Sequence, residues 1–167
     1  MTEAALDKID VDSSPDAWGS HMPALRAIAR YIEIRSVIEF GAGLYSTQLF
    51  LSRHFPLLES LISLESNSDW ADKARTDDPR HVMMVYSSPG ECVEKSIGMK
   101  ADFVFVDSAG SRFDEVEHGL TIAPVVAIHD CLEVELMGRG YKYVRGFNSK
   151  IQTVFVSNTV DLSNLKI

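Results

Sequence analysis

The chain has 167 residues, of which 46% are hydrophobic and 24% charged, and its formal net charge is -8 at pH 7. This composition is typical of a globular protein, and a chain of about 100–200 residues fits one domain. The negative charge disfavours nucleic acid as a partner, because it repels phosphate backbones and no stripe of Lys and Arg offsets it. No apolar run approaches the roughly 18 residues that a membrane helix needs, so we expect no membrane association.

The first residues lack the basic and apolar regions of a secretory signal. Cys92 and Cys131 form neither a disulfide framework nor a CxxC metal motif, so we expect two reduced, buried thiols and a cytoplasmic protein. Residues 1–15 are polar and acidic and are predicted to be mobile. Residues 16–167 are predicted to form a single domain.

The first predicted element is an amphipathic helix over residues 23–32, followed by short runs rich in Val, Ile and Phe that alternate with helical stretches. The predicted strands cover residues 36–40, 61–65, 81–86, 103–107 and 125–130, and the predicted helices cover 46–54, 69–75, 89–97 and 112–120. This alternation predicts an α/β fold with a Rossmann-like, doubly wound and mostly parallel sheet. Residues 141–147 and 152–157 are predicted to close that sheet as an antiparallel hairpin.

The segment Glu39-Phe40-Gly41-Ala42-Gly43 runs from a predicted strand into a predicted helix through two glycines. Glycine permits a sharp turn and the close approach of a ligand, and free N–H groups at a helix start attract anions. Two glycines alone are a weak motif, and an ordinary turn is an equal alternative. The carboxylate of Glu39 is costly to bury without a partner such as an ammonium group.

A second acid, Glu65, ends the next predicted strand. This is about the spacing at which α/β nucleotide folds hold ribose hydroxyls on an acid. The alternative for Glu65 is a solvated carboxylate at the end of a strand. Together with the glycine loop, the acid favours nucleoside binding.

These segments resemble class I S-adenosylmethionine-dependent methyltransferases. Ile38-Glu39-Phe40-Gly41-Ala42-Gly43 with Ser46-Thr47 is similar to motif I, and residues 64–74 are similar to the segment after it. Phe103-Val104-Phe105-Val106-Asp107 and Ala127-Ile128-His129-Asp130 are similar to the family's fourth and fifth strands. The resemblance covers roughly residues 20–157, and it implies S-adenosylmethionine as cofactor and the class I methyltransferase fold.

The resemblance also implies roles for single residues. The methionine half of the cofactor would lie against Glu39, Gly41, Ala42, Gly43 and Ser46, and the ribose hydroxyls against Glu65. Ser66, Asn67 and Trp70 would flank the ribose and adenine. Ser87 or Ser88 stands where the family often has an Asp, so recognition of adenine departs from the family's pattern.

Asp107, His129 and Asp130 are predicted at the carboxyl ends of adjacent strands, the edge at which open α/β sheets bind ligands. We expect Asp107 to bind the methionine ammonium or to face the acceptor, and His129 and Asp130 to line the acceptor pocket or to bond structurally. Some O-methyltransferases of this fold place Mg²⁺ on comparable acids. One His among three groups makes an incomplete oxygen cage, so we predict no metal.

His21 precedes the first predicted helix, where it could act as a general base because imidazole titrates near neutrality. The equal alternative is that Ser20 caps the helix and His21 lies on the surface. His54, His81 and His118 belong to no constellation and are interpreted as structural.

We therefore expect a methyltransferase that acts on an O or N atom of a small acceptor, with a homo-oligomer as one way to complete a shallow acceptor pocket. One alternative is an NAD-dependent oxidoreductase, whose fingerprint favours a third glycine near position 46 and no acid at position 39. Another is a cofactor-binding protein without turnover. DNA amino-methyltransferases are disfavoured, because Asp107-Ser108-Ala109-Gly110 lacks their Asn/Asp-Pro-Pro-aromatic motif.

Overall fold

The computed structural model describes residues 10–12 and 19–166. Of the segment predicted to be mobile, only residues 10–12 are among them, and the prediction otherwise lies outside the described residues. The strands are β1 (Ser36–Phe40), β2 (Ser60–Glu65), β3 (His81–Val85), β4 (Phe103–Val106), β5 (Val125–His129), β6 (Tyr143–Phe147) and β7 (Thr153–Ser157). The helices are α1 (Met22–Tyr31), α2 (Leu44–Phe50), α3 (Ser68–Ala74), α4 (Pro89–Ser96), α5 (Arg112–Ile122) and α6 (Glu133–Leu136).

The strands form one sheet in the order β3-β2-β1-β4-β5-β7-β6. The strands from β3 to β5 are parallel to their neighbours, whereas β7 is antiparallel to both β5 and β6. This confirms the predicted mostly parallel sheet with an antiparallel closing hairpin. The chain reverses its direction of winding between β1 and β4, and in open α/β sheets ligands bind at the carboxyl ends of strands at such a switch point.

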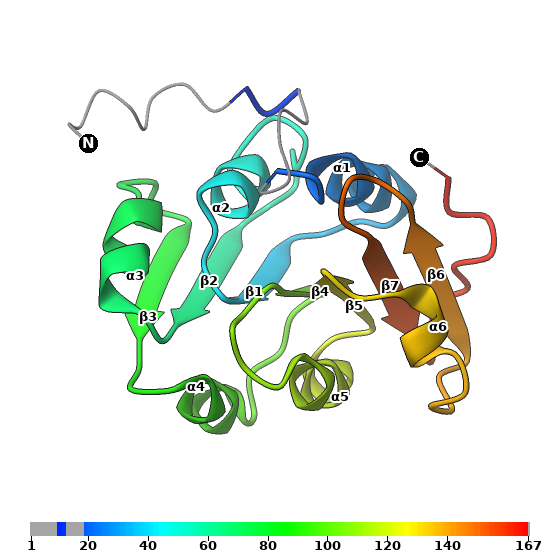
Figure 1. The fold of residues 1–167 in the computed structure, drawn as a ribbon. Coiled ribbons are helices and arrows are strands. Elements are labelled where there is room, and N and C mark those ends of the chain that lie inside the picture. Colours follow the sequence, from blue (N-terminus) through cyan, green and yellow to red (C-terminus); the bar gives the residue numbers. More distant parts are fainter. Residues whose placement is uncertain (1–9, 13–18, 167) are drawn as a thin grey trace.

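Helices cover both faces of the sheet, with α1 and α2 on one side and α4 and α5 on the other (Figure 1). Strand β4 shows why its sequence is apolar throughout. Phe103 and Phe105 pack in the core under α1 and α2, while Val104 and Val106 pack in the core under α5. A parallel strand buried on both faces has no polar side to present, which explains the continuous hydrophobic run.

The structure differs from the sequence prediction at α2 and α6. Helix α2 begins at Leu44, directly after the glycine loop, and ends at Phe50, so it is shorter than predicted. Helix α6 is absent from the sequence prediction, because four residues are too few for helical periodicity to show and the side chains of Val134 and Met137 are exposed. Among the described residues, no helix is both long and apolar enough to cross a membrane.

Candidate functional site

The glycine loop fits between β1 and the end of β4. Gly41 has a φ of +84°, a conformation that favours glycine, and its N–H donates to the carbonyl of Leu64 at 2.9 Å. A Cβ atom at position 41 would stand 2.5 Å from the carbonyl oxygen of Asp107. Glycine is therefore required here by both conformation and space.

Glu39 is fully buried under this loop and is hydrogen-bonded by hydroxyl groups. Its carboxylate accepts from Thr47 Oγ1 at 2.9 Å, from Ser63 Oγ at 2.6 Å and from Ser46 Oγ. Burial raises the pKa of Glu39 to about 7, although the three hydroxyls act in the opposite direction. The buried acid on β1 is thus hydrogen-bonded to the start of α2 and to β2. Ser46, which was predicted to bind the cofactor, makes one of these hydrogen bonds.

Glu65 lies at the carboxyl end of β2 and joins it to the glycine loop. Its carboxylate accepts from the backbone N–H groups of Ala42 at 2.9 Å, Ser66 at 2.7 Å and Asn67 at 2.8 Å, and the residue is only 7% exposed. A carboxylate has about four acceptor positions, so three backbone donors leave capacity for one more. The structure brings the two predicted nucleoside-binding segments together at one edge.

The other predicted cofactor residues begin the helices at this edge. Asn67 caps α3 by accepting from the N–H of Trp70 at 3.1 Å. Ser88 caps α4 by accepting from the N–H of Glu91 at 3.1 Å, and Ser87 donates its hydroxyl to Glu91 Oε2 at 2.6 Å. These contacts fix the turns after β2 and β3, and both serines remain exposed.

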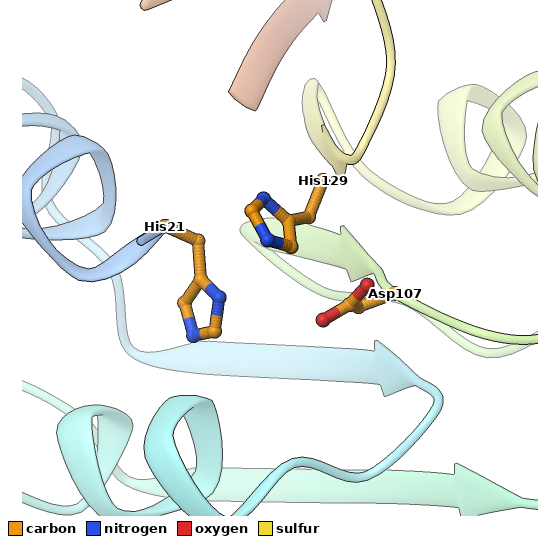
Figure 2. A group of neighbouring side chains, drawn as sticks. All are labelled: His21, Asp107 and His129. Carbon is orange, nitrogen blue, oxygen red and sulfur yellow. The ribbon is translucent and has the colours of Figure 1, made fainter. Parts of the chain in front are cut away.

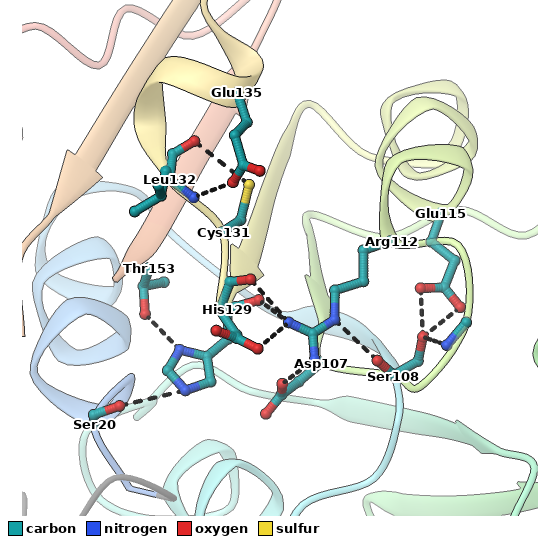
Figure 3. Close-up of polar contacts among 12 residues, drawn as sticks. Ser20, Asp107, Ser108, Arg112, Glu115, His129, Cys131, Leu132, Glu135 and Thr153 are labelled. Carbon is teal, nitrogen blue, oxygen red and sulfur yellow. Dashed lines mark hydrogen bonds and ion pairs between the residues drawn. The ribbon is translucent and has the colours of Figure 1, made fainter. Parts of the chain in front are cut away.

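Arg112, at the start of α5, connects the ends of β4 and β5, and the sequence reading missed it (Figure 3). Its guanidinium donates to the carbonyl oxygens of Ser108 at 3.0 Å, His129 at 2.8 Å and Asp130 at 3.0 Å. Its Nη2 lies 3.9 Å from Asp107 Oδ1, and its Nη1 lies 3.2 Å from Asp130 Oδ2. A basic residue in the first turn of a helix is unfavourable next to the positive end of the helix dipole. Arg112 at the start of the predicted helix was therefore the signal in the sequence that could have indicated a special role.

The two strand-end acids differ in environment. Burial raises the pKa of Asp107 to about 7, and the Arg112 guanidinium acts in the opposite direction. The side chain of Asp130 is 63% exposed, and the residue has a positive φ of 55°. Sequence reading also missed Glu115, which is buried, accepts a hydrogen bond from Ser108 Oγ at 2.6 Å, and has its pKa raised to about 7 by burial.

His21 lies inside the protein, so its predicted surface position is wrong. It is 2% exposed, and its ring packs against the ring of Phe105 with a centroid distance of 5.2 Å. Ser20 does not cap α1 either, since His21 is the N-cap residue and makes no side-chain cap bond, while the Ser20 hydroxyl lies 3.3 Å from His129 Nε2. The reason is that helix α1 packs with its first turn against β4, which carries His21 into the core.

Burial and the neighbouring His129 hold the pKa of His21 well below 6.5. A base with a strongly lowered pKa accepts protons poorly at neutral pH, so this environment does not favour the general-base role. His129 is also buried, and its Nδ1 lies 3.1 Å from the hydroxyl of Thr153 on β7.

The remaining histidines contact nearby polar groups. His54 pairs with Asp12, His81 lies 3.1 Å from the hydroxyls of Ser63 and Thr76, and His118 lies 2.8 Å from the hydroxyl of Ser96. Both cysteines are buried free thiols, as predicted.

An open pocket of about 440 Å³ lies beyond the carboxyl end of β5. It is lined by side chains from the segment around α6 and from the turn between β6 and β7: Asp130, Cys131, Leu132, Glu135, Lys150, Ile151 and Gln152. The lining carries both acidic and basic groups next to the strand-end residues.

Neither a family model nor a curated protein matches the chain. Solved structures match over most of its length. An O-methyltransferase from Bacillus cereus, in complex with SAH, has a TM-score of 0.59 and 16% identity, covering 92% of this chain and 86% of its own. The O-methyltransferase TomG from Streptomyces achromogenes, in complex with SAM, has a TM-score of 0.61 and 14% identity, covering 90% and 91%.

Spermidine synthase from Thermotoga maritima is also similar, with a TM-score of 0.63 and 12% identity over 87% of this chain and 61% of its own. At these sequence identities the similarity shows the fold alone. Proteins named as O-methyltransferases and a spermidine synthase share this fold, so the fold by itself does not identify the reaction. The antiparallel β7 between β5 and β6, the glycine loop after β1 and these structural neighbours together show that the chain has the class I methyltransferase fold.

Proposed function

We propose that the protein is an S-adenosylmethionine-dependent methyltransferase that transfers a methyl group to an O or N atom of a small acceptor. The contact between Glu65 and the N–H of Ala42 carries this proposal, because it joins the acid after β2 to the glycine loop after β1 at the switch point of the sheet. The cofactor-bound O-methyltransferases with the same fold support it.

In this proposal the cofactor lies along the carboxyl edge of the sheet. Gly41 and Gly43 let the methionine half approach the backbone, and Asp107 faces its ammonium group. Glu65 accepts from one ribose hydroxyl with its remaining capacity. The turns after β2 and β3 flank the adenine, with Trp70 as the aromatic surface.

Methyl transfer from a sulfonium needs mainly alignment of the acceptor with the carbon–sulfur bond and exclusion of water. The pocket beside Asp130 is the acceptor site in this proposal, since it adjoins the carboxyl end of β5. Glu135 and Lys150 on its wall fit a small polar acceptor better than a polyanion, which the net charge of -8 also disfavours. A second copy of the chain could cover this open pocket.

The oxidoreductase alternative fits the architecture less well. The usual dinucleotide-binding sheet has the order 3-2-1-4-5-6 with parallel strands. Here an antiparallel strand, β7, lies between β5 and β6, and a buried acid, Glu39, precedes the glycine loop. The cofactor-binding alternative without turnover shares every feature of the site and is separated only by an activity measurement.

Titration calorimetry with S-adenosylhomocysteine, S-adenosylmethionine and NADH tests the cofactor assignment. We expect the first two to bind and NADH to give no heat, and the reverse preference would remove the methyltransferase proposal. Incubation with S-adenosylmethionine and a metabolite extract, followed by mass spectrometry, should give a product heavier by one methylene. Binding without any product would favour the non-catalytic alternative instead.

A further inference from the structure

Three side chains converge between α1 and the carboxyl ends of β4 and β5 (Figure 2). His21 precedes α1, Asp107 follows β4, and His129 ends β5. Each offers one ligand atom, and these atoms all lie within 4.8 Å of one another. The three residues are far apart in the sequence, so only the fold brings them together.

His21 is the most informative member of this cluster. It is 2% exposed, and neither its Nδ1 nor its Nε2 has a hydrogen-bond partner among residues 10–12 and 19–166. Its ring lies between those of Phe105 and His129, with centroid distances of 5.2 Å and 4.9 Å. Buried polar atoms are almost always bonded, so an imidazole with two unbonded nitrogens needs a further partner, such as an ion or a water molecule.

His129 is held in place by the residues around it. The hydroxyl of Thr153 lies 3.1 Å from Nδ1, and the hydroxyl of Ser20 lies 3.3 Å from Nε2. When Nδ1 donates to Thr153, Nε2 carries the lone pair, and an ion bound there would take the place of the Ser20 hydroxyl. Metal-binding histidines are commonly oriented in this way, with the second ring nitrogen bonded to a protein group.

We infer that His21, His129 and Asp107 form a binding site for a divalent transition metal of the zinc type. Two imidazoles and one carboxylate are a known zinc ligand set that leaves a coordination position open for water or substrate. Zinc holds such atoms at about 2.0–2.2 Å, so binding draws the three side chains closer together.

This ligand set differs from the group Asp107, His129 and Asp130 that the sequence suggested as an incomplete site for Mg²⁺. The side chain of Asp130 is 63% exposed and pairs with Arg112 at 3.2 Å, and its carboxylate is not one of the three clustered ligand groups. His21 takes the third position instead. Two nitrogen ligands favour zinc, iron, cobalt or nickel over Mg²⁺, which prefers oxygen.

The location suggests what the ion does, and this step rests on the proposed function. At the carboxyl ends of β4 and β5 the ion borders the proposed acceptor side, where a hydroxyl bound at its open position would lose its proton more readily. Asp107 has two carboxylate oxygens, so one faces the ion and the other faces the cofactor ammonium. The acceptor class would then be a compound with a metal-binding hydroxyl group.

The test is metal binding by the full chain without any cofactor. Protein stripped with a chelator is titrated with Zn²⁺ and with Mg²⁺ by calorimetry, and with Co²⁺ by visible absorption, which reports nitrogen and oxygen ligands in a low-symmetry site. We expect one Zn²⁺ per chain, no Mg²⁺ binding, and a Co²⁺ spectrum that Zn²⁺ abolishes. His21→Ala and His129→Ala should each weaken Zn²⁺ binding at least 100-fold.

His54→Ala is the matched control, because His54 pairs with Asp12 away from the cluster and should leave the metal affinity unchanged. His21→Gln, which keeps a polar side chain of similar size, replaces His21→Ala if that variant does not fold. Equal Zn²⁺ affinity in the wild type and a folded His21 variant would overturn the inference, as would loss of binding in His54→Ala or preference for Mg²⁺. Binding of S-adenosylhomocysteine is measured separately, so failure of the proposed function and failure of the metal site give different results.

Discussion

The α carbon of Gly41 approaches Asp107 so closely that a Cβ atom would lie 2.5 Å from the Asp107 carbonyl oxygen and 2.7 Å from its carbonyl carbon. These atoms belong to the backbone of Asp107, directly after β4, so they cannot move aside as a flexible side chain would. The position of the glycine loop and the position of the strand-end acid are therefore set by the same contact.

This contact predicts that Gly41→Ala is more damaging than its backbone conformation alone explains. Gly98 has nearly the same φ, +85°, but a Cβ there would meet nothing within 4 Å, so Gly98→Ala is a matched control. We expect Gly41→Ala to reduce the free energy of unfolding by about 1–3 kcal/mol more than Gly98→Ala, the cost of inserting an atom into a packed site. Urea unfolding followed by circular dichroism measures the difference, and equal losses would contradict it.

Glu65→Ala is expected to weaken the binding of S-adenosylhomocysteine by about 1–3 kcal/mol, the scale of charge-assisted hydrogen bonds left unmade. The substitution also removes the acceptor for the N–H groups of Ala42, Ser66 and Asn67. Glu59→Ala is the control, because Glu59 precedes the same strand at its other end and pairs with Arg35 on the surface. Unchanged affinity in calorimetry would show that Glu65 only orders the loop.

The pH dependence of stability should reveal the buried acid Glu39. Its pKa rises from 4.5 to about 7 on folding, so between these values the native state keeps a proton that the unfolded state has lost. The free energy of unfolding therefore falls as the pH rises through this range, by at most about 1.4 kcal/mol per pH unit for one proton. Glu39→Gln should give a flatter curve.

Asp107 and Glu115 also have pKa values raised to about 7, and they contribute to both curves. The difference between the wild-type curve and the Glu39→Gln curve reports Glu39 together with its coupling to Asp107, whose pKa the charge of Glu39 raises. Parallel curves from pH 4.5 to pH 7 would mean that Glu39 is ionised in the native protein at the same pH as in the unfolded chain.

Arg112→Lys is expected to destabilise the protein, although the charge is kept. The guanidinium donates to three backbone carbonyls at the carboxyl ends of β4 and β5, and a lysine ammonium does not reproduce its planar set of donors. We expect a loss of about 1–3 kcal/mol in urea unfolding, and faster amide exchange around Asp130. Arg53→Lys serves as control, since Arg53 pairs with Asp12 on the surface, and a loss of similar size there would count against the specific role of Arg112.

Asp107→Asn separates the two sides of the proposed site. Because the carboxylate would bond the cofactor ammonium, the neutral amide should reduce the affinity for S-adenosylhomocysteine about tenfold, within the range of a charge-assisted bond. Calorimetry measures that affinity directly. Full affinity with lower turnover would assign Asp107 to the acceptor side alone.

The fold could be predicted from the sequence because its signals are local. Strand β4 is a continuous apolar run, and Gly41 marks the turn that ends β1, so the alternation of strands and helices was enough to predict a mostly parallel sheet, although not the order of its strands. Helix α6 escaped because its four residues are shorter than the window in which periodicity is measured.

The site was only partly predictable, because its remaining contacts join residues distant in sequence. Ser63 donates to Glu39 from the neighbouring strand, and Arg112 donates to carbonyls at the end of β5, and no residue pattern along the chain encodes these contacts. The burial of His21 depends on how α1 packs against Phe105. The cofactor roles of Glu65 and the glycine loop remain predictions that the binding experiments address.

The antiparallel strand β7 sets the order in which this protein matures during synthesis. The ribosome releases β5 and β6 before β7, yet β7 lies between them and supplies Thr153, the partner of the His129 ring. Until that strand emerges, the edge of β5 is unpaired and the imidazole has no partner from the closing hairpin. Sheet closure is therefore a late, long-range event of the kind that slows folding, and the contact between Thr153 and His129 forms only after β7 pairs with β5.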